Sequence, residues 1–267
     1  MKKPISNWLD LYGTHFNSRL LLGTAKYPSM DILLDAIKVA QPAMVTMALR
    51  RETAATQASH GLFDTLKQTD ITILPNTAGC RSADEAITTA LCACDLYQTD
   101  WIKLEVIGCD NTLQPDPFQL ITAAETLIKK NLKVLPYCTE DLIVARRLID
   151  VGCRVLMPWA APIGTGQGVV NEYGMRKLRE YFPEIPLIVD AGLGLPSHAC
   201  QVMEWGYDGV LLNTAVSQAN DPIKMAQAFS QAVQAGHNAY RAGPCAKSDI
   251  AKPSTPTVGM PIWHYDK

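Results

Sequence analysis

Short apolar runs alternate with amphipathic stretches eight times between residues 19 and 242. The runs are rich in branched apolar side chains, as buried strands are, and the stretches between them mostly repeat their apolar residues with the period of a helix. Strands that alternate with helices pair in parallel through right-handed crossovers. Eight such units in a chain of this length predict a (β/α)8 TIM barrel, an α/β fold with one parallel eight-stranded sheet.

The predicted elements follow one another without a long gap. The predicted strands are 20–26, 44–50, 71–77, 101–108, 133–138, 154–160, 187–192 and 208–215. The predicted helices are one that begins at Ser29 and those over 57–68, 82–96, 116–130, 141–151, 173–182, 197–204 and 221–240. An open doubly wound sheet is the alternative, but the Gly-x-Gly-x-x-Gly turn usual after its first strand is missing.

The two ends of the chain differ from this repeating body. Residues 1–18 carry five large apolar side chains, enough to pack against the barrel. Residues 243–267 contain four prolines, small polar residues and no periodicity, which is typical of a loosely ordered tail. We therefore expect an N-terminal segment (1–18) that packs on the barrel, a catalytic barrel domain (19–242) and a Pro-rich tail (243–267).

Charge and composition exclude several classes of protein. The chain has 24 Lys and Arg against 26 Asp and Glu, without the basic stripe of a nucleic-acid-binding protein. No apolar run reaches the roughly 20 residues of a membrane span, and the N-terminus lacks the apolar core of a signal peptide. The eight cysteines form no Cys-x-x-Cys pair, so we expect reduced, mostly buried thiols and no metal site. A cytoplasmic protein that binds neither nucleic acid nor membrane is the expectation.

The fourth predicted strand carries two charged residues on one face. Side chains alternate along a strand, so Lys103 and Glu105 share a face opposite the apolar residues at 102, 104 and 106. The apolar face suits the surrounding helices, which leaves Lys103 and Glu105 pointing into the barrel. Buried charges are normally paired or functional. The two interpretations are a structural ion pair and a Schiff-base lysine whose neighbouring carboxylate moves protons.

Asp190 ends the seventh predicted strand, after a run of branched apolar residues. Catalytic groups of this fold project from the carboxyl ends of the strands, which places Asp190 at the barrel mouth. Its alternative role is to cap the loop that follows. The sequence therefore predicts an acidic group that faces the barrel mouth.

Small residues gather at the ends of the last three predicted strands. Loops after strands 7 and 8 commonly bind phosphate in this fold, because glycine lets backbone N–H groups approach an anion. These positions predict a phosphorylated substrate. They are Gly164, Gly166 and Gly168 after the sixth strand, Gly192 and Gly194 after the seventh, and Asn213 and Thr214 at the end of the eighth.

Several motifs in one order carry a family resemblance. With LLGTAKYPS, LPNTAGCRSADEA, WIKLEVIG, APIGTGQG, IVDAGLGLPS and DGVLLNTAV, the chain resembles the thiazole synthases of bacterial thiamin biosynthesis from about residue 19 to 243. The resemblance implies a barrel enzyme that condenses 1-deoxy-D-xylulose 5-phosphate, dehydroglycine and sulfur into a thiazole phosphate carboxylate. It implies that sulfur arrives as the C-terminal thiocarboxylate of a small ubiquitin-like carrier protein. It further implies a homo-oligomer, with a tetramer as the expected size, and no cofactor or metal in this chain.

The same resemblance assigns roles to individual residues. The lysine of the KLEVIG motif, Lys103 here, forms an imine with the sugar ketone, and Glu105 and Asp190 are the acid–base carboxylates. The sequence departs from the family pattern near these motifs at Ala25, Cys109, Ala160 and His198. The expected contacts to the sugar phosphate are Gly164, Ala191, Gly192, Asn213 and Thr214.

Two rival functions share parts of this site. A sugar-phosphate aldolase uses a Schiff-base lysine but needs no protein partner. A scaffold that binds the carrier without turnover needs no lysine chemistry, and the presence of Lys103, Glu105 and Asp190 argues against it.

Overall fold

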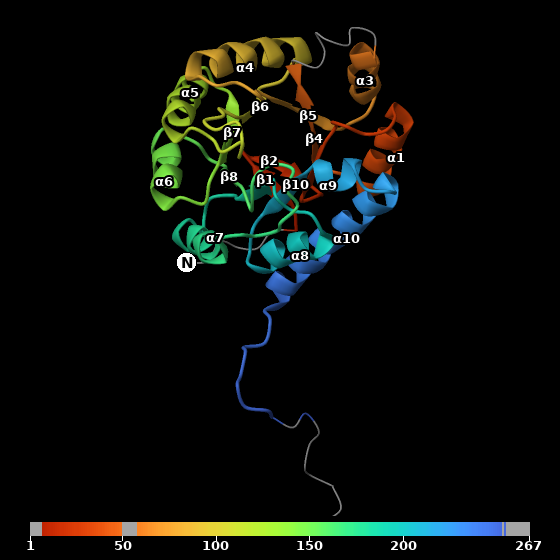
Figure 1. Cartoon of the computed structure of the whole chain (residues 1–267), viewed down its shortest axis with the longest axis vertical. Helices are drawn as coiled ribbons and strands as arrows, with labels where there is room; N and C mark the ends of the chain where they lie inside the picture. Colours follow the sequence, from red (N-terminus) through yellow and green to blue (C-terminus); the bar gives the residue numbers. More distant parts are fainter. Residues whose placement is uncertain (1–6, 50–57, 253, 255–267) are drawn as a thin grey trace, which may run out of the picture.

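Eight parallel strands close into a barrel in the described part of the chain (Figure 1). The computed structural model describes residues 7–49, 58–252 and 254. The strands are β3 (Leu20–Gly23), β4 (Met44–Ala48), β5 (Thr72–Asn76), β6 (Trp101–Leu104), β7 (Lys133–Cys138), β8 (Met157–Pro158), β9 (Ile188–Asp190) and β10 (Gly209–Leu212).

The strand order confirms the predicted TIM barrel. Strands β3 to β8 pair in sequence order, and β3 also pairs with β10, which pairs with β9. A parallel bridge between Leu156 and Leu187 joins the two remaining edges, next to β8 and β9. An open doubly wound sheet would keep two free edges, so that alternative is wrong.

Helices surround the barrel, one after each strand, with a short additional helix before the last. The predicted starts at Ser29, Asp116, Asp141 and Asp221 are confirmed, because each side chain accepts a backbone N–H of its helix's first turn. The helices of the described part are α1 (Met30–Ala40), α3 (Ala58–Lys67), α4 (Ala83–Tyr97), α5 (Pro117–Lys129), α6 (Leu142–Asp150), α7 (Glu172–Tyr181), α8 (Pro196–Glu204), α9 (Thr214–Ser217) and α10 (Pro222–Ala242).

The residues from Ser82 to Glu85 at the start of α4 form an altered capping box. The Ser82 hydroxyl accepts the N–H of Glu85 at 3.2 Å. The Glu85 carboxylate, however, accepts the N–H of Arg81 at 2.8 Å, one residue before the cap. This places the loop after β5 firmly against the start of α4.

Most strands are shorter than predicted, because residues at their carboxyl ends leave the ladder. The predicted strand 101–108 ends at Leu104, where a hydroxyl of the preceding loop takes over the backbone hydrogen bonds. The predicted strand 154–160 is reduced to Met157–Pro158, and Pro158 has no N–H to donate. Residues freed in this way line the barrel mouth.

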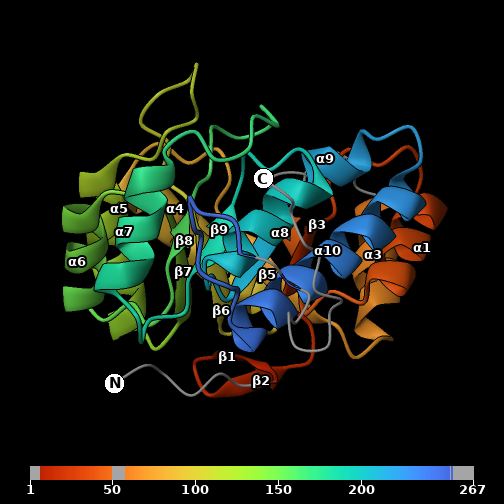
Figure 2. The ribbon, with the colours of Figure 1, turned by 90° about the horizontal axis from the view of Figure 1, so that it is seen from below.

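A hairpin of β1 (Leu9–Leu11) and β2 (Thr14–Phe16) lies across the amino ends of the barrel strands (Figure 2). Leu9, Leu11 and Phe16 are buried against the side chains that fill the lower barrel. This apolar layer closes one end, so the barrel interior is open only at the other end. The layer's strand residues are Leu21, Met44, Leu74, Trp101, Leu135, Met157, Ile188 and Leu211.

Residues 243–252 follow α10 without helix or strand and are exposed. Figure 1 shows this segment leading away from the barrel. Trp263, Arg50 and Arg51 lie outside the described residues. Within the described residues, no helix is long and apolar enough to cross a membrane.

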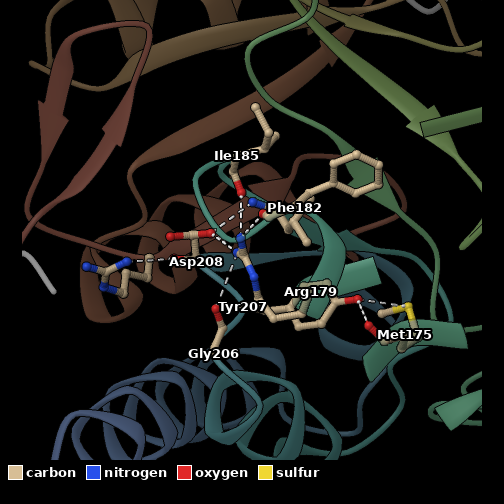
Figure 3. A network of polar contacts seen from close by, with 9 residues as sticks. Met175, Arg179, Phe182, Ile185, Gly206, Tyr207 and Asp208 are labelled. Carbon is tan, nitrogen blue, oxygen red and sulfur yellow. Dashed lines mark hydrogen bonds and ion pairs between the residues drawn. The ribbon is translucent and has the colours of Figure 1, made fainter. Parts of the chain in front are cut away.

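One partly buried arginine ties the amino ends of the last strands together (Figure 3). Arg179 of α7 pairs with Asp208 at 2.8 Å and donates to the carbonyls of Phe182 and Ile185. Asp208 also holds the start of β9, because its carboxylate accepts the N–H of Leu187 at 2.9 Å. The network therefore fixes α7, the loop after it and two strand starts.

Replacement of this arginine tests its structural role. Arg179→Ala leaves the Asp208 carboxylate without its counter-charge and two carbonyls without their side-chain donor, so we expect a loss of about 2 to 3 kcal/mol in the free energy of unfolding. Urea denaturation measures it. The control is Arg176→Ala on the same helix, whose exposed pair with Glu172 spans 3.5 Å and contributes at most about 0.5 kcal/mol. Equal losses in both variants would contradict the role of the network.

Candidate active site

A cavity of about 710 Å³ opens at the carboxyl ends of the strands. This is the end opposite the hairpin, where the fold places active sites. All eight residues to which the family resemblance assigns a role line this one cavity. They are Lys103, Glu105, Gly164, Asp190, Ala191, Gly192, Asn213 and Thr214. Of the further predicted glycines, Gly166 and Gly194 line it whereas Gly168 does not.

Three charged side chains meet at the bottom of the cavity. The Lys103 Nζ lies 2.6 Å from Asp190 Oδ2 and 3.1 Å from Glu105 Oε1. All three residues are buried. The predicted inward face of β6 is confirmed, and Asp190 of β9 reaches the same lysine from across the barrel. The cluster carries two negative charges and one positive charge in a nearly water-free place.

Burial and charge act against each other on these groups. Burial alone would lower the pKa of Lys103, but the charges of Asp190 and Glu105 outweigh it and raise this pKa above its usual value. Burial raises the pKa of Asp190 to about 6, although the Lys103 ammonium opposes the shift. Lys103 is therefore an ammonium at neutral pH. Its ion-pair partner Asp190 is a carboxylate whose pKa is raised.

A buried threonine, which sequence reasoning missed, fixes the backbone of Glu105. The Thr77 Oγ1 accepts the Glu105 N–H at 2.8 Å and donates to the Glu105 carbonyl at 2.7 Å. The Thr77 N–H donates to the Lys103 carbonyl at 3.2 Å. These bonds replace the ladder between β5 and β6 beyond the last paired residues. Thr77 is the last residue of the predicted strand 71–77, in LPNTAG, and a polar residue at a strand end was the available signal.

The two glycine-rich loops after β8 and β9 pack directly on each other. A β-carbon on Gly192 would lie 2.3 Å from the Ala161 backbone nitrogen, and one on Gly194 would lie 2.3 Å from the Gly166 carbonyl oxygen. Gly192 also has a φ of +82°, which side chains disfavour. Glycine is required here for close approach and for backbone conformation.

These loops leave backbone donors at the cavity wall. Among the described residues, no protein acceptor takes a hydrogen bond from the N–H of Gly164 or Gly192. Thr214 follows on the same wall, and a β-carbon on Gly164 would lie 3.8 Å from its hydroxyl oxygen. Free N–H groups and a hydroxyl on one wall suit an anionic group such as a phosphate.

Asn213 links this wall to the first barrel strand. Its Oδ1 accepts the N–H of Ala25 at 3.2 Å, and a β-carbon on Gly23 would lie 2.6 Å from the Asn213 β-carbon. The amide oxygen therefore holds the loop after β3, while the amide nitrogen remains as the group that can meet a ligand.

A loop after β6 rises at the cavity rim, beside the loop after β8 (Figure 2). Ile107 and Pro115 form a bridge at its base, and both Ile107 and Leu113 line the cavity. Arg81 pairs with Asp110 on the outside of this loop. The sequence pattern did not identify Leu113 as a cavity residue, because its side chain is placed by a turn and not by strand alternation.

No cysteine of the described residues lines the cavity. Every cysteine of the described part is free, but only half of them are buried (Cys80, Cys94, Cys138 and Cys153), fewer than expected, because Cys109 and Cys200 are partly exposed and Cys92 and Cys245 are exposed. Among the described residues, no three His, Cys, Asp or Glu side chains come together as metal ligands.

Comparisons with known proteins agree with this geometry. The family model described as "Thiazole biosynthesis protein ThiG" matches residues 10–256. A thiazole synthase of Burkholderia thailandensis is 63% identical over 258 residues, which cover 97% of this chain and 95% of that protein. One of Ralstonia nicotianae is 62% identical over 260 residues, covering 97% and 94%.

Solved structures show the same fold. The crystal structure of the Amycolatopsis orientalis BexX/CysO complex contains a chain that is 30% identical, with a TM-score of 0.81 over 91% of this chain and 99% of that one. A thiamine phosphate pyrophosphorylase from Pyrococcus furiosus is 18% identical, with a TM-score of 0.57 over 82% of this chain and 96% of that one. At that identity the likeness concerns the barrel alone.

The charge balance of the cluster predicts the effect of removing its cation. Lys103→Met leaves two buried carboxylates without a counter-charge, so we expect a loss of about 3 kcal/mol in the free energy of unfolding at pH 8. Removal of the ammonium raises the folded-state pKa of Asp190 further above its unfolded value, so the folded state binds more protons and stability falls as pH rises. The loss should shrink from pH 8 to pH 5 in urea denaturation. The control, Lys129→Met, removes an exposed pair with Glu125 and should show no such pH dependence. A loss independent of pH would contradict the role of the buried charges.

Proposed function

Because the chain belongs to the thiazole synthase family of thiamine biosynthesis, we propose that it condenses 1-deoxy-D-xylulose 5-phosphate, dehydroglycine and sulfur through an imine on Lys103. The observation that carries the proposal is the ion-paired Lys103 at the bottom of a cavity, 2.6 Å from Asp190 and 3.1 Å from Glu105. A lysine amine placed between two proton-transfer groups suits imine chemistry on a ketone.

The sugar phosphate binds with its phosphate on the glycine-rich wall. The donors are the backbone N–H groups of Gly164 and the Ala191–Gly192 turn, together with Asn213 and Thr214. The net charge of the chain is −2, so a basic overall field does not attract the substrate. Local backbone donors hold the anion, and its ketone then faces Lys103.

Imine formation begins with loss of the Lys103 proton. Asp190 accepts this proton, since it lies at 2.6 Å and its pKa is raised to about 6. The free amine attacks the ketone carbon, a C–N bond forms, and the ketone oxygen leaves as water after it has received two protons. Asp190 and Glu105 then move protons so that the imine isomerises and the carbonyl shifts to the neighbouring carbon.

Sulfur enters at that carbon from a ubiquitin-like carrier protein with a C-terminal thiocarboxylate. Acyl transfer and loss of water release the carrier, and dehydroglycine closes the thiazole ring. The similar Amycolatopsis orientalis structure is a complex of BexX with CysO, which supports a protein partner for this barrel. We place the protein in the cytoplasm as a homo-oligomer, with a tetramer as the proposed size.

Borohydride trapping tests the imine. With 1-deoxy-D-xylulose 5-phosphate and sodium borohydride, the protein should gain one covalent sugar phosphate, and tandem mass spectrometry should place it on Lys103. Lys103→Ala should gain none, whereas Lys26→Ala, which removes an exposed lysine after β3, should react like the wild type. An adduct that survives Lys103→Ala would overturn the assignment. Release of a sugar fragment without carrier would identify an aldolase.

The pH dependence of trapping tests the proton acceptor. Below its pKa of about 6, Asp190 carries a proton and accepts none from Lys103. The initial trapping rate should therefore rise with pH through about 6 and then level off. Asp190→Asn should lower the rate by about a hundredfold and remove this rise. A rise that Asp190→Asn retains would assign the titration to another group.

A further inference from the structure

A buried tyrosine lies directly behind the Lys103 ion pair. Tyr137 alternates with Leu135 on β7, and Leu135 belongs to the apolar layer inside the barrel, so Tyr137 also faces inward. Its ring centroid lies 5.7 Å from the Lys103 Nζ, and its exposed fraction is 0%. The ring thus contacts the cation from the side away from the cavity.

The hydroxyl of this tyrosine is an unused donor. Tyr137 Oη is buried and has no hydrogen-bond partner among the described residues. An unpaired buried hydroxyl destabilises the folded state relative to a satisfied one. Burial first, and then the charges of Asp190 and Glu105, raise the pKa of Tyr137, so the phenol keeps its proton. The phenol is therefore an available donor within electrostatic reach of both carboxylates.

The ring of Tyr137 is held in place from its other side. Trp159 meets it edge to face, with 6.5 Å between ring centroids. The Trp159 indole N–H donates to Glu140 at 2.6 Å, and the second Glu140 oxygen accepts from Asn171 at 2.7 Å. A ring fixed in this way cannot turn its hydroxyl toward bulk water without breaking the network.

Imine formation changes which hydrogen-bond donors are available to the Asp190 and Glu105 carboxylates. At rest the Lys103 ammonium contacts both of them. When Lys103 turns toward the substrate ketone, that contact is lost, and a buried carboxylate without a donor is costly. We propose that the Tyr137 hydroxyl then donates to the carboxylate that Lys103 has left, and so positions it for proton transfer. Tyr137 is a positioning residue and keeps its proton throughout. This inference rests on the proposed imine.

Removal of the hydroxyl alone tests the proposal. Tyr137→Phe should lower the maximal trapping rate at least tenfold with little change in the sugar phosphate concentration at half-maximal rate. At saturating sugar phosphate it should also shift the rise near pH 6 upward, since in that complex the carboxylate that Lys103 has left lacks its donor and holds its proton more tightly. The titratable groups that face the phenol are Lys103, Glu105, Asp190 and Cys138. The thermal midpoint should stay equal or rise, because the hydroxyl has no partner at rest.

A matched control separates this role from a structural one. Tyr207 is also buried, but its hydroxyl donates to the Met175 carbonyl at 2.8 Å (Figure 3). Tyr207→Phe should lower the thermal midpoint and leave the trapping rate and pH profile unchanged. Wild-type trapping in Tyr137→Phe would overturn the role of Tyr137 and leave the imine intact. Absence of any adduct in the wild type would overturn the proposed function itself.

A double-mutant cycle tests the same donor without any substrate. In Lys103→Met the carboxylates lack the ammonium, so the phenol should already donate to one of them. Tyr137→Phe should then lower the thermal midpoint in the Lys103→Met background, although it does not do so in the wild type. An equal effect in both backgrounds would overturn the proposal. If Lys103→Met does not fold, the trapping rate and pH profile of Tyr137→Phe decide.

Discussion

The contact of one buried ammonium with two buried carboxylates is the interaction on which the site depends. Neither Lys103, Glu105 nor Asp190 could stay charged in this place alone, because burial would drive each to its neutral form. Together they keep their charges, and Asp190 is held close to the proton that imine formation must remove. The ion pairs that stabilise the buried charges in the folded protein therefore also place Asp190 beside the proton that Lys103 must lose.

The barrel supplies this cluster by closing one end and opening the other. The hairpin and the apolar layer above it fill the amino end, so water reaches the charges only through the mouth. At the mouth the strands end early and their polar residues become loops. Thr77 and Asn213 hold two of these loops by replacing ladder hydrogen bonds with side-chain ones. The apolar layer at the amino end and the loops at the carboxyl ends thus place the Lys103 ammonium and the neutral backbone donors within one cavity.

The sequence predicted the parts of this arrangement that follow from local periodicity. Strand alternation was enough to place Lys103 and Glu105 inside the barrel, and eight strand–helix units were enough for its closure. Periodicity could not show that Asp190 meets the same lysine, since that contact crosses the barrel. It also could not show the strand ends, which depend on side chains such as Thr77. The sequence pattern did not identify Tyr137, because its missing hydrogen-bond partner is a property of the folded cluster alone.

The proposed chemistry requires that Lys103 bond covalently to a sugar whose phosphate lies on the glycine-rich wall. A crystal structure of the borohydride-reduced adduct tests both parts at once. We expect a single C–N bond from Lys103 Nζ to the former ketone carbon, with the phosphate against the N–H groups of Gly164 and Gly192. A sugar bonded to another lysine, or a phosphate bound away from these loops, would contradict this chemistry.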